Sequence, residues 1–86
     1  MKTYEISYAR GVKKDFGAID KKYHARIMAA IYELANNPRP AGIKKLVGYD
    51  GHYRLRVGDY RVIYEIQDGK LTILVVEVGH RKDIYR

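Results

Sequence analysis

The sequence predicts an α+β domain in which an N-terminal strand is followed by a two-helix hairpin and then by a three-strand antiparallel meander, in the order β-α-α-β-β-β. Three observations predict this order. Residue types alternate near the N-terminus, apolar residues recur at helical spacing in the next segment, and the second half consists of short apolar runs separated by glycine-containing turns. Because 86 residues suffice for one small hydrophobic core, we expect residues 1–86 to form a single domain.

The first half of the chain is expected to hold one strand and both helices. Residues 2–8 alternate with a period of two, which is typical of a strand. From Ala9 the apolar spacing becomes helical and predicts a short helix that carries Val12, Phe16 and Ile19. Asp20 is a suitable N-cap for a longer helix, whose apolar stripe consists of Tyr23, Ile27, Ala30, Ile31 and Leu34. This helix should end at Asn36-Asn37-Pro38, since proline disfavours helical backbone at the residue before it.

The second half is expected to form the meander. A first strand can begin at residues 45–47, and further strands are predicted over residues 53–57, 61–66 and 71–78. Gly58-Asp59 predicts a two-residue hairpin turn, and Asp68-Gly69 predicts a second tight turn. Residues 71–78 are apolar on both faces, as in a central strand. Gly79 is expected to end the sheet and to release a polar tail, residues 80–86.

The amino-acid composition limits the classes of function that this protein can have. Lys and Arg number 17 against ten Asp and Glu, a net charge of +7, so nucleic acid or an acidic protein surface is the expected partner. The absence of cysteine excludes disulfides, thiol catalysis and cysteine-ligated zinc. The three histidines, His24, His52 and His80, lack ligand spacing, so neither a metal nor another cofactor is expected. The longest apolar stretch, residues 71–78, is far shorter than the ~20 residues of a membrane span, so we expect a cytoplasmic protein without a membrane partner.

Three arginines are predicted to share one face of the sheet. The two-residue turn sets a register in which Arg56 lies opposite Arg61, and Arg54 lies two residues further along the same face. Like charges in this arrangement destabilise a sheet by up to ~1 kcal/mol, so the cluster needs a reason. One interpretation is a solvated basic face, neutralised by Asp59, Glu65 or Asp83. The other is an anion site, because guanidinium groups bind phosphate oxygens in a bidentate way. Residues 39–61 hold six basic and two acidic side chains, a local charge of +4, which favours the anion site.

The C-terminal run offers further candidates. His80 is a candidate acid or base, Arg81 a candidate phosphate ligand, and Tyr85 an aromatic hydroxyl, all within six residues. The alternative interpretation is a frayed basic tail. The nine tyrosines either fill a small core with their hydroxyls in water or provide faces on which RNA bases stack.

Three segments occur in a telling order: Lys45-Leu46-Val47-Gly48, then the run from Tyr53 to Tyr64, then Val78-Gly79-His80-Arg81 with Tyr85 close behind. Together they resemble the RelE toxins of the RelE/ParE superfamily, over nearly the whole chain. The resemblance implies the toxin of a type II toxin–antitoxin system that enters the ribosomal A site and cleaves the mRNA there without a metal or cofactor. The partners it implies are the ribosome with its RNA, the mRNA, and a RelB-like antitoxin.

The resemblance also implies catalytic roles. Arg61 and Arg81 match arginines that hold and stabilise the scissile phosphate, and Tyr85 matches the C-terminal catalytic tyrosine. The cleavage needs a group that takes the proton of the ribose 2′-OH. We expect Tyr85 to take it, with His80 as a substitute.

The sequence departs from the family pattern at two positions. Arg54 and Arg56 stand where the best-known members have lysines, and a guanidinium with a pKa above ~12 is a poor base. We therefore expect Arg54 and Arg56 to bind RNA phosphates, together with Lys44 and Lys45. The alternative function is that of a ParE-like toxin, which shares the fold and inhibits DNA gyrase without nuclease chemistry.

Overall fold

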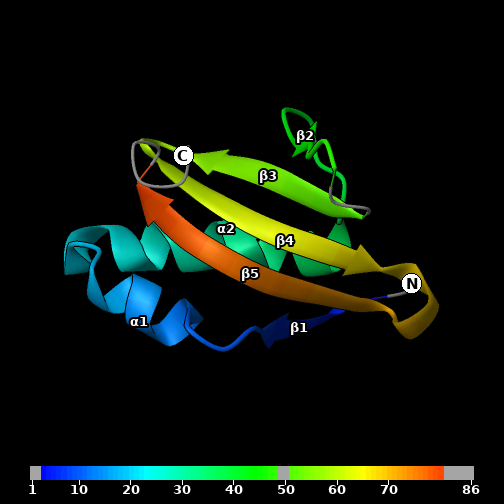
Figure 1. Ribbon diagram of the computed structural model, residues 1–86, viewed down its shortest axis with the longest axis horizontal. Coiled ribbons are helices and arrows are strands. Elements are labelled where there is room, and N and C mark those ends of the chain that lie inside the picture. Colours follow the sequence, from blue (N-terminus) through cyan, green and yellow to red (C-terminus); the bar gives the residue numbers. More distant parts are fainter. Residues whose placement is uncertain (1–2, 49–50, 81–86) are drawn as a thin grey trace.

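The computed structural model describes residues 3–48 and 51–80. Its elements are, in chain order, β1 (Glu5–Tyr8), α1 (Val12–Gly17), the 3₁₀ turn η1 (Lys21–Tyr23), α2 (His24–Asn36), β2 (Lys44–Lys45), β3 (His52–Val57), β4 (Tyr60–Gln67), the 3₁₀ turn η2 (Asp68–Lys70) and β5 (Thr72–His80). The strands form one sheet in the order β1-β5-β4-β3-β2 (Figure 1). The predicted α+β order and the antiparallel meander, β3 to β5, are confirmed, and β2 adds a two-residue strand at one edge.

Strand β1 joins the sheet beside β5 and runs parallel to it, from Glu5 opposite Thr72 to Tyr8 opposite Val75. The chain between these strands forms the helical layer. In Figure 1 α2 lies behind the sheet and crosses behind β4 and β5, whereas α1 lies beside β5 at the edge of the sheet where β1 is found. One face of the sheet is therefore covered by α2, and the opposite face is turned toward the viewer. Neither helix in residues 3–48 and 51–80 is long and apolar enough to cross a membrane.

The core lies between α2 and the covered face of the sheet. The stripe predicted for the long helix is confirmed, since Ile27, Ile31 and Leu34 are buried. The strands contribute Val57, Val62, Tyr64, Ile66, Ile73, Val75 and Val78. Tyr64 is fully buried, and its hydroxyl donates a hydrogen bond to the carbonyl of Pro38 at 2.8 Å, so the buried oxygen keeps a partner.

The predicted N-cap Asp20 caps the 3₁₀ turn η1 that leads into the long helix, and not α2 itself, whose N-cap is Tyr23 without a side-chain hydrogen bond. The carboxylate of Asp20 accepts a hydrogen bond from the backbone N–H of Lys22 at 3.1 Å. The first turn after this cap is the 3₁₀ turn η1, and the α-helical part begins at His24.

The connection between β4 and β5 corrects the predicted tight turn at Asp68-Gly69. Gln67 pairs with Thr72, so four residues connect the strands: η2 and then Leu71 in the left-handed region at φ 49°. Contacts with distant residues explain the longer loop. The carboxylate of Asp68 accepts hydrogen bonds from Tyr4 Oη at 2.5 Å and from Arg39 Nη2 at 2.9 Å, which hold it outside a tight turn.

Strand β5 also ends later than predicted. Its pairing with β4 continues through Gly79 to His80, opposite Tyr60, so Gly79 does not end the sheet. The ladder has a bulge, because Tyr64 pairs with Val75 whereas Ile63 pairs with Glu77. The extra residue shifts the alternation of β5, which is why Val75 and Val78 both face the core.

Replacing Asp68 by asparagine is expected to lower the melting temperature at neutral pH. It should also make the melting temperature depend less on pH in the acid range. The hydrogen bonds from Arg39 and then from Tyr4 hold the pKa of Asp68 below its ordinary value of 3.8. The ionised carboxylate therefore stabilises the fold fully above that ordinary value, and its contribution is lost as the pH falls through the lower folded-state pKa. Melting curves of both proteins, recorded by circular dichroism, should converge below pH 3.8. A constant gap over the whole acid range would contradict this role.

Candidate nucleic-acid interface

Three arginines share the sheet face opposite the helices. In the β3–β4 ladder Arg56 pairs with Arg61, and Arg54 pairs with Ile63. Alternate residues of a strand point to opposite faces, so these arginines lie on one side while Val62 lies in the core on the other. The register predicted from the Gly58-Asp59 turn is confirmed, and with it the cross-strand pair of like charges.

Arg61 is the most buried of the three. Its exposed fraction is 7%, whereas Arg56 is exposed. Arg61 Nη1 donates to the carbonyl of Tyr60 at 3.4 Å, and Arg56 Nε donates to the carbonyl of Gly58 at 3.3 Å. A cation that is largely removed from water attracts an approaching anion through a lower dielectric than a solvated one does. Arg61 is therefore the strongest candidate in the described residues for stabilising a phosphate.

The two lysines predicted to bind RNA separate in the structure. Lys44 lies opposite Arg54 in the β2–β3 ladder and extends the arginine cluster on the same face. Lys45 lies opposite Tyr53, whose ring packs against the core, so its position belongs to the other face. Both lysines are exposed.

Arg26 is a further cation near the cluster that the sequence analysis missed. Gly58 has a φ of 62°, as a hairpin turn of this kind requires, and a methyl group placed on it would lie 3.4 Å from Arg26 Nη1. The Arg26 guanidinium therefore rests against the β3–β4 turn. The ring of Tyr23, one helical turn before Arg26, supports the same placement, because its centroid lies 5.1 Å from that of Tyr60.

His80 does not join the arginines. It pairs with Tyr60, and the two rings meet edge to face with centroids 5.5 Å apart. Tyr60 packs against the core on the helical side, so His80 faces the helices there. The residue of β5 opposite Arg61 is Gly79, on the face of the arginines. Arg81 and Tyr85, the other two predicted catalytic residues, lie outside the described residues.

A carboxylate from α1 anchors the end of β5 that leads to this site. Asp15 Oδ2 accepts a hydrogen bond from the backbone N–H of Val78 at 3.2 Å, just past the bulge. The bond ties helix and strand together across 63 positions of the sequence. It holds the strand residues next to Arg61 in place from the helical side.

The alternative to an anion site is a basic face that nearby acidic residues neutralise. Glu65 does share the face of Arg61, but it lies four residues along β4, about 13 Å away at a strand rise of about 3.3 Å per residue. Its carboxylate there accepts a hydrogen bond from Gln67 Nε2 at 2.5 Å. Glu65 thus belongs to the far end of the face, and a nearer carboxylate on this face is that of Glu77 of β5, which pairs with Ile63. Within residues 3–48 and 51–80, no three His, Cys, Asp or Glu side chains gather so that they could hold a metal ion.

The helical side carries an apolar hollow of about 420 Å³, lined by Tyr8, Val12, Lys13, Phe16, His24 and Met28. Tyr8 and Tyr32, two of the large apolar side chains that stay exposed, are 43% and 58% accessible. Burial first and the neighbouring Tyr32 second raise the pKa of Tyr8. The hollow can accept apolar side chains from a partner, with Lys13 at its lining to meet a carboxylate.

Solved structures with the same architecture identify the class of fold. The chain matches the RelB–RelE antitoxin–toxin complex from Methanococcus jannaschii with a TM-score of 0.75 and 34% identity, over 92% of this chain and 94% of that one. It matches the archaeal RelE–RelB complex from Pyrococcus horikoshii OT3 with a TM-score of 0.80 and 28% identity, over 92% and 96%. The fold is that of a RelE-type toxin.

Sequence relatives agree with the fold. Residues 6–85 match the family described as the ParE toxin of the type II toxin–antitoxin system parDE. Toxin RelE3 of Methanocaldococcus jannaschii is 35% identical over 94% of this chain and 94% of the relative, and toxin RelG of Mycobacterium tuberculosis is 31% identical over 96% and 97%. This chain belongs to the ParE toxin family, within the RelE/ParE superfamily of type II toxins. The resemblance to RelE toxins inferred from the sequence is confirmed.

Proposed function

We propose that this protein is the toxin of a type II toxin–antitoxin pair and acts as a metal-independent, ribosome-dependent mRNA endonuclease. The observation that carries the proposal is the row of Arg54, Arg56 and Arg61 on one sheet face, with Arg61 largely buried. Placing like charges opposite one another weakens a sheet unless an anion joins them. A phosphate of the mRNA backbone is an anion of suitable shape for guanidinium groups.

The proposed reaction is an internal transfer at one phosphate. The 2′-oxygen of the ribose forms a bond to the adjacent phosphorus, and the bond from phosphorus to the 5′-oxygen of the next nucleotide breaks. The products are a 2′,3′-cyclic phosphate and a 5′-hydroxyl. A base accepts the proton of the 2′-hydroxyl, and an acid returns one to the leaving oxygen. The charge that builds on the phosphorane in between is the one that Arg61 would stabilise.

We assign the base to Tyr85, with Arg81 as charge stabiliser or proton donor. The placement of His80 supports this choice over the substitute, because His80 packs on Tyr60 on the helical side of the sheet. Arg54 and Arg56 would bind the RNA backbone, and Lys44 would extend that contact along the same face. Arg26, at the turn, would meet phosphates at the rim.

The proposal includes an antitoxin as partner. Two structural relatives are RelB–RelE complexes, which supports a RelB-like protein as the antitoxin of this chain. An acidic amphipathic segment would fit the apolar hollow on the helical side, since its apolar residues would enter beside Phe16 and Met28 while a carboxylate meets Lys13. Cytoplasmic action follows from the proposed ribosomal target.

Mapping mRNA 5′ ends on programmed ribosomes tests the proposed function. With purified protein we expect cuts in phase with the codon in the A site, products ending in a 2′,3′-cyclic phosphate, and no effect of a metal chelator. Naked mRNA should stay intact, and the antitoxin encoded beside the toxin should abolish the cuts.

Two outcomes would overturn the proposal. Intact mRNA together with DNA breaks that depend on gyrase would replace it with the ParE-like alternative. Intact mRNA and intact DNA, with ribosome binding retained, would identify a binding module without catalysis.

A further inference from the structure

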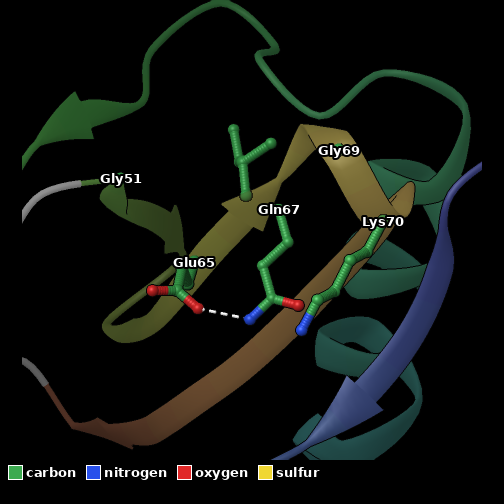
Figure 2. A pocket seen from close by; sticks show the side chains of 6 residues that line it. Gly51, Glu65, Gln67, Gly69 and Lys70 are labelled. Carbon is green, nitrogen blue, oxygen red and sulfur yellow. Dashed lines mark hydrogen bonds between the residues drawn. The ribbon is translucent and has the colours of Figure 1, made fainter.

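A hollow whose lining includes charged and polar side chains lies at the other end of the sheet from the arginines. It has a volume of about 490 Å³ and is lined by Gly51, Glu65, Ile66, Gln67, Gly69 and Lys70. Figure 2 shows the side chain of Gln67 between those of Glu65 and Lys70, with the polar ends of all three close together. The hollow is open and large enough for a planar ring.

This hollow adjoins the face that carries the arginines. Residues 61, 63, 65 and 67 of β4 alternate with the core residues Val62, Tyr64 and Ile66, so Glu65 and Gln67 point to the same side as Arg61. Glu65 lies about 13 Å along the strand from Arg61, given a rise of about 3.3 Å per residue. A short single-stranded segment held at Arg61 can therefore reach the hollow.

The charge of Glu65 decides which part of a nucleic acid fits there. A carboxylate repels phosphate, so the hollow suits a base rather than the backbone. Carboxylates and amides recognise bases through the N–H groups on the base edges.

The hydrogen bond between Gln67 and Glu65 determines which hydrogen-bonding atoms the hollow presents to a ligand. Gln67 Nε2 donates to Glu65 Oε1 at 2.5 Å, which orients the amide. Glu65 then presents its second carboxylate oxygen and Gln67 its carbonyl oxygen, both acceptors. Lys70 adds a donor. These three side chains offer two acceptors and one cationic donor, and His52 lies opposite Glu65 in the β3–β4 ladder.

Guanine has the complementary edge. Its N1–H and its N2 amino group donate hydrogen bonds side by side, and its O6 accepts from a lysine. Adenine and cytosine each present one amino donor beside acceptors, and uracil presents one N–H between two carbonyls. Only guanine matches two adjacent acceptors and a neighbouring donor at once.

We propose that Glu65, Gln67 and Lys70 form a guanine-selective base pocket for the RNA strand that crosses the arginine face. The pocket rests on the proposed function, because it takes the mRNA as its ligand. It makes Glu65 a specificity-determining residue and gives Gln67 the task of presenting its carbonyl to the base.

Nuclear magnetic resonance titrations of the full chain with guanosine 5′-monophosphate and adenosine 5′-monophosphate test the pocket. The side-chain amide of Gln67 and the backbone amides of Gly51 and Gly69 report on it. Their shifts should saturate at about tenfold lower concentration of the guanine nucleotide, the discrimination expected of one good base contact. The Glu65→Gln variant should bind both nucleotides alike. The matched control Glu33→Gln, on the exposed face of α2, should keep the preference.

Equal affinities for both nucleotides in the wild-type protein, or an undiminished preference in Glu65→Gln, would overturn the pocket. So would shifts confined to arginine resonances, since the phosphate alone would then account for binding. The titration needs neither ribosomes nor cleavage. A guanine preference without any mRNA cleavage would leave the pocket standing and refute the nuclease, whereas cleavage without a guanine preference would refute the pocket alone.

Discussion

Replacing Arg61 by alanine is expected to slow mRNA cleavage on ribosomes by about 10²–10³-fold, the loss typical when one group that stabilises transition-state charge is removed. Arg61 lies opposite Arg56 on the arginine face and is only 7% exposed, so its charge acts in a partly desolvated setting. Single-turnover cleavage rates on programmed ribosomes measure the effect. Arg61→Lys should retain part of the activity, because it keeps the charge and loses the bidentate geometry.

Two controls make this result specific. Arg10→Ala removes the same charge from an exposed site before α1 and should cleave at a rate within about a factor of two of wild type. Because Arg61 is buried, each variant should first be shown to melt cooperatively. A folded Arg61→Ala protein that cleaves at the wild-type rate would exclude Arg61 from the site.

Replacing Tyr64 by alanine is expected to cost about 3–5 kcal/mol of unfolding free energy, as for other large aromatic residues removed from a core. Tyr64 is fully buried on the helical side of β4, and its hydroxyl bonds the carbonyl of Pro38. Since a small domain has about 5–15 kcal/mol in total, the variant should be close to unfolding at room temperature. Urea unfolding followed by circular dichroism measures the change.

The Tyr64→Phe variant separates the hydrogen bond from the packing. It leaves the ring in place and removes the donor to Pro38, so we expect a loss of about 1 kcal/mol. Tyr32→Ala is the matched control, because Tyr32 is 58% exposed and should change stability by no more than about 0.5 kcal/mol. Equal losses in Tyr64→Ala and Tyr32→Ala would contradict the assignment of Tyr64 to the core.

The arginine face shows what a local sequence pattern can predict about strand pairing. A two-residue turn leaves a single register for the strands on either side, so the pairing of Arg56 with Arg61 could be predicted from residues 54–61 alone. The prediction succeeded because every residue that it used lies within one hairpin. The Asp68-Gly69 turn failed on the same kind of reasoning, since Asp68 is drawn away by Tyr4 and Arg39 from distant parts of the chain.

His80 shows a second limit. In the sequence it stands next to Arg81 and close to Tyr85, which makes it a candidate base beside them. In the structure β5 continues to His80, and its cross-strand neighbour Tyr60 belongs to the helical side. Adjacent residues of a strand point to opposite faces, so closeness in sequence did not mean a shared site.

The sequence by itself determined the order of strands and helices, the apolar stripe of α2 and the arginine row, because each depends on a short period or a tight turn. Only the tertiary structure decided that β1 lies beside β5, that Arg26 rests on the β3–β4 turn, and that Asp15 anchors β5. It also brought Gly51 and Lys70 to the hollow beside Glu65. These features depend on contacts between residues far apart in the chain, and no local spacing encodes which distant partner a side chain meets.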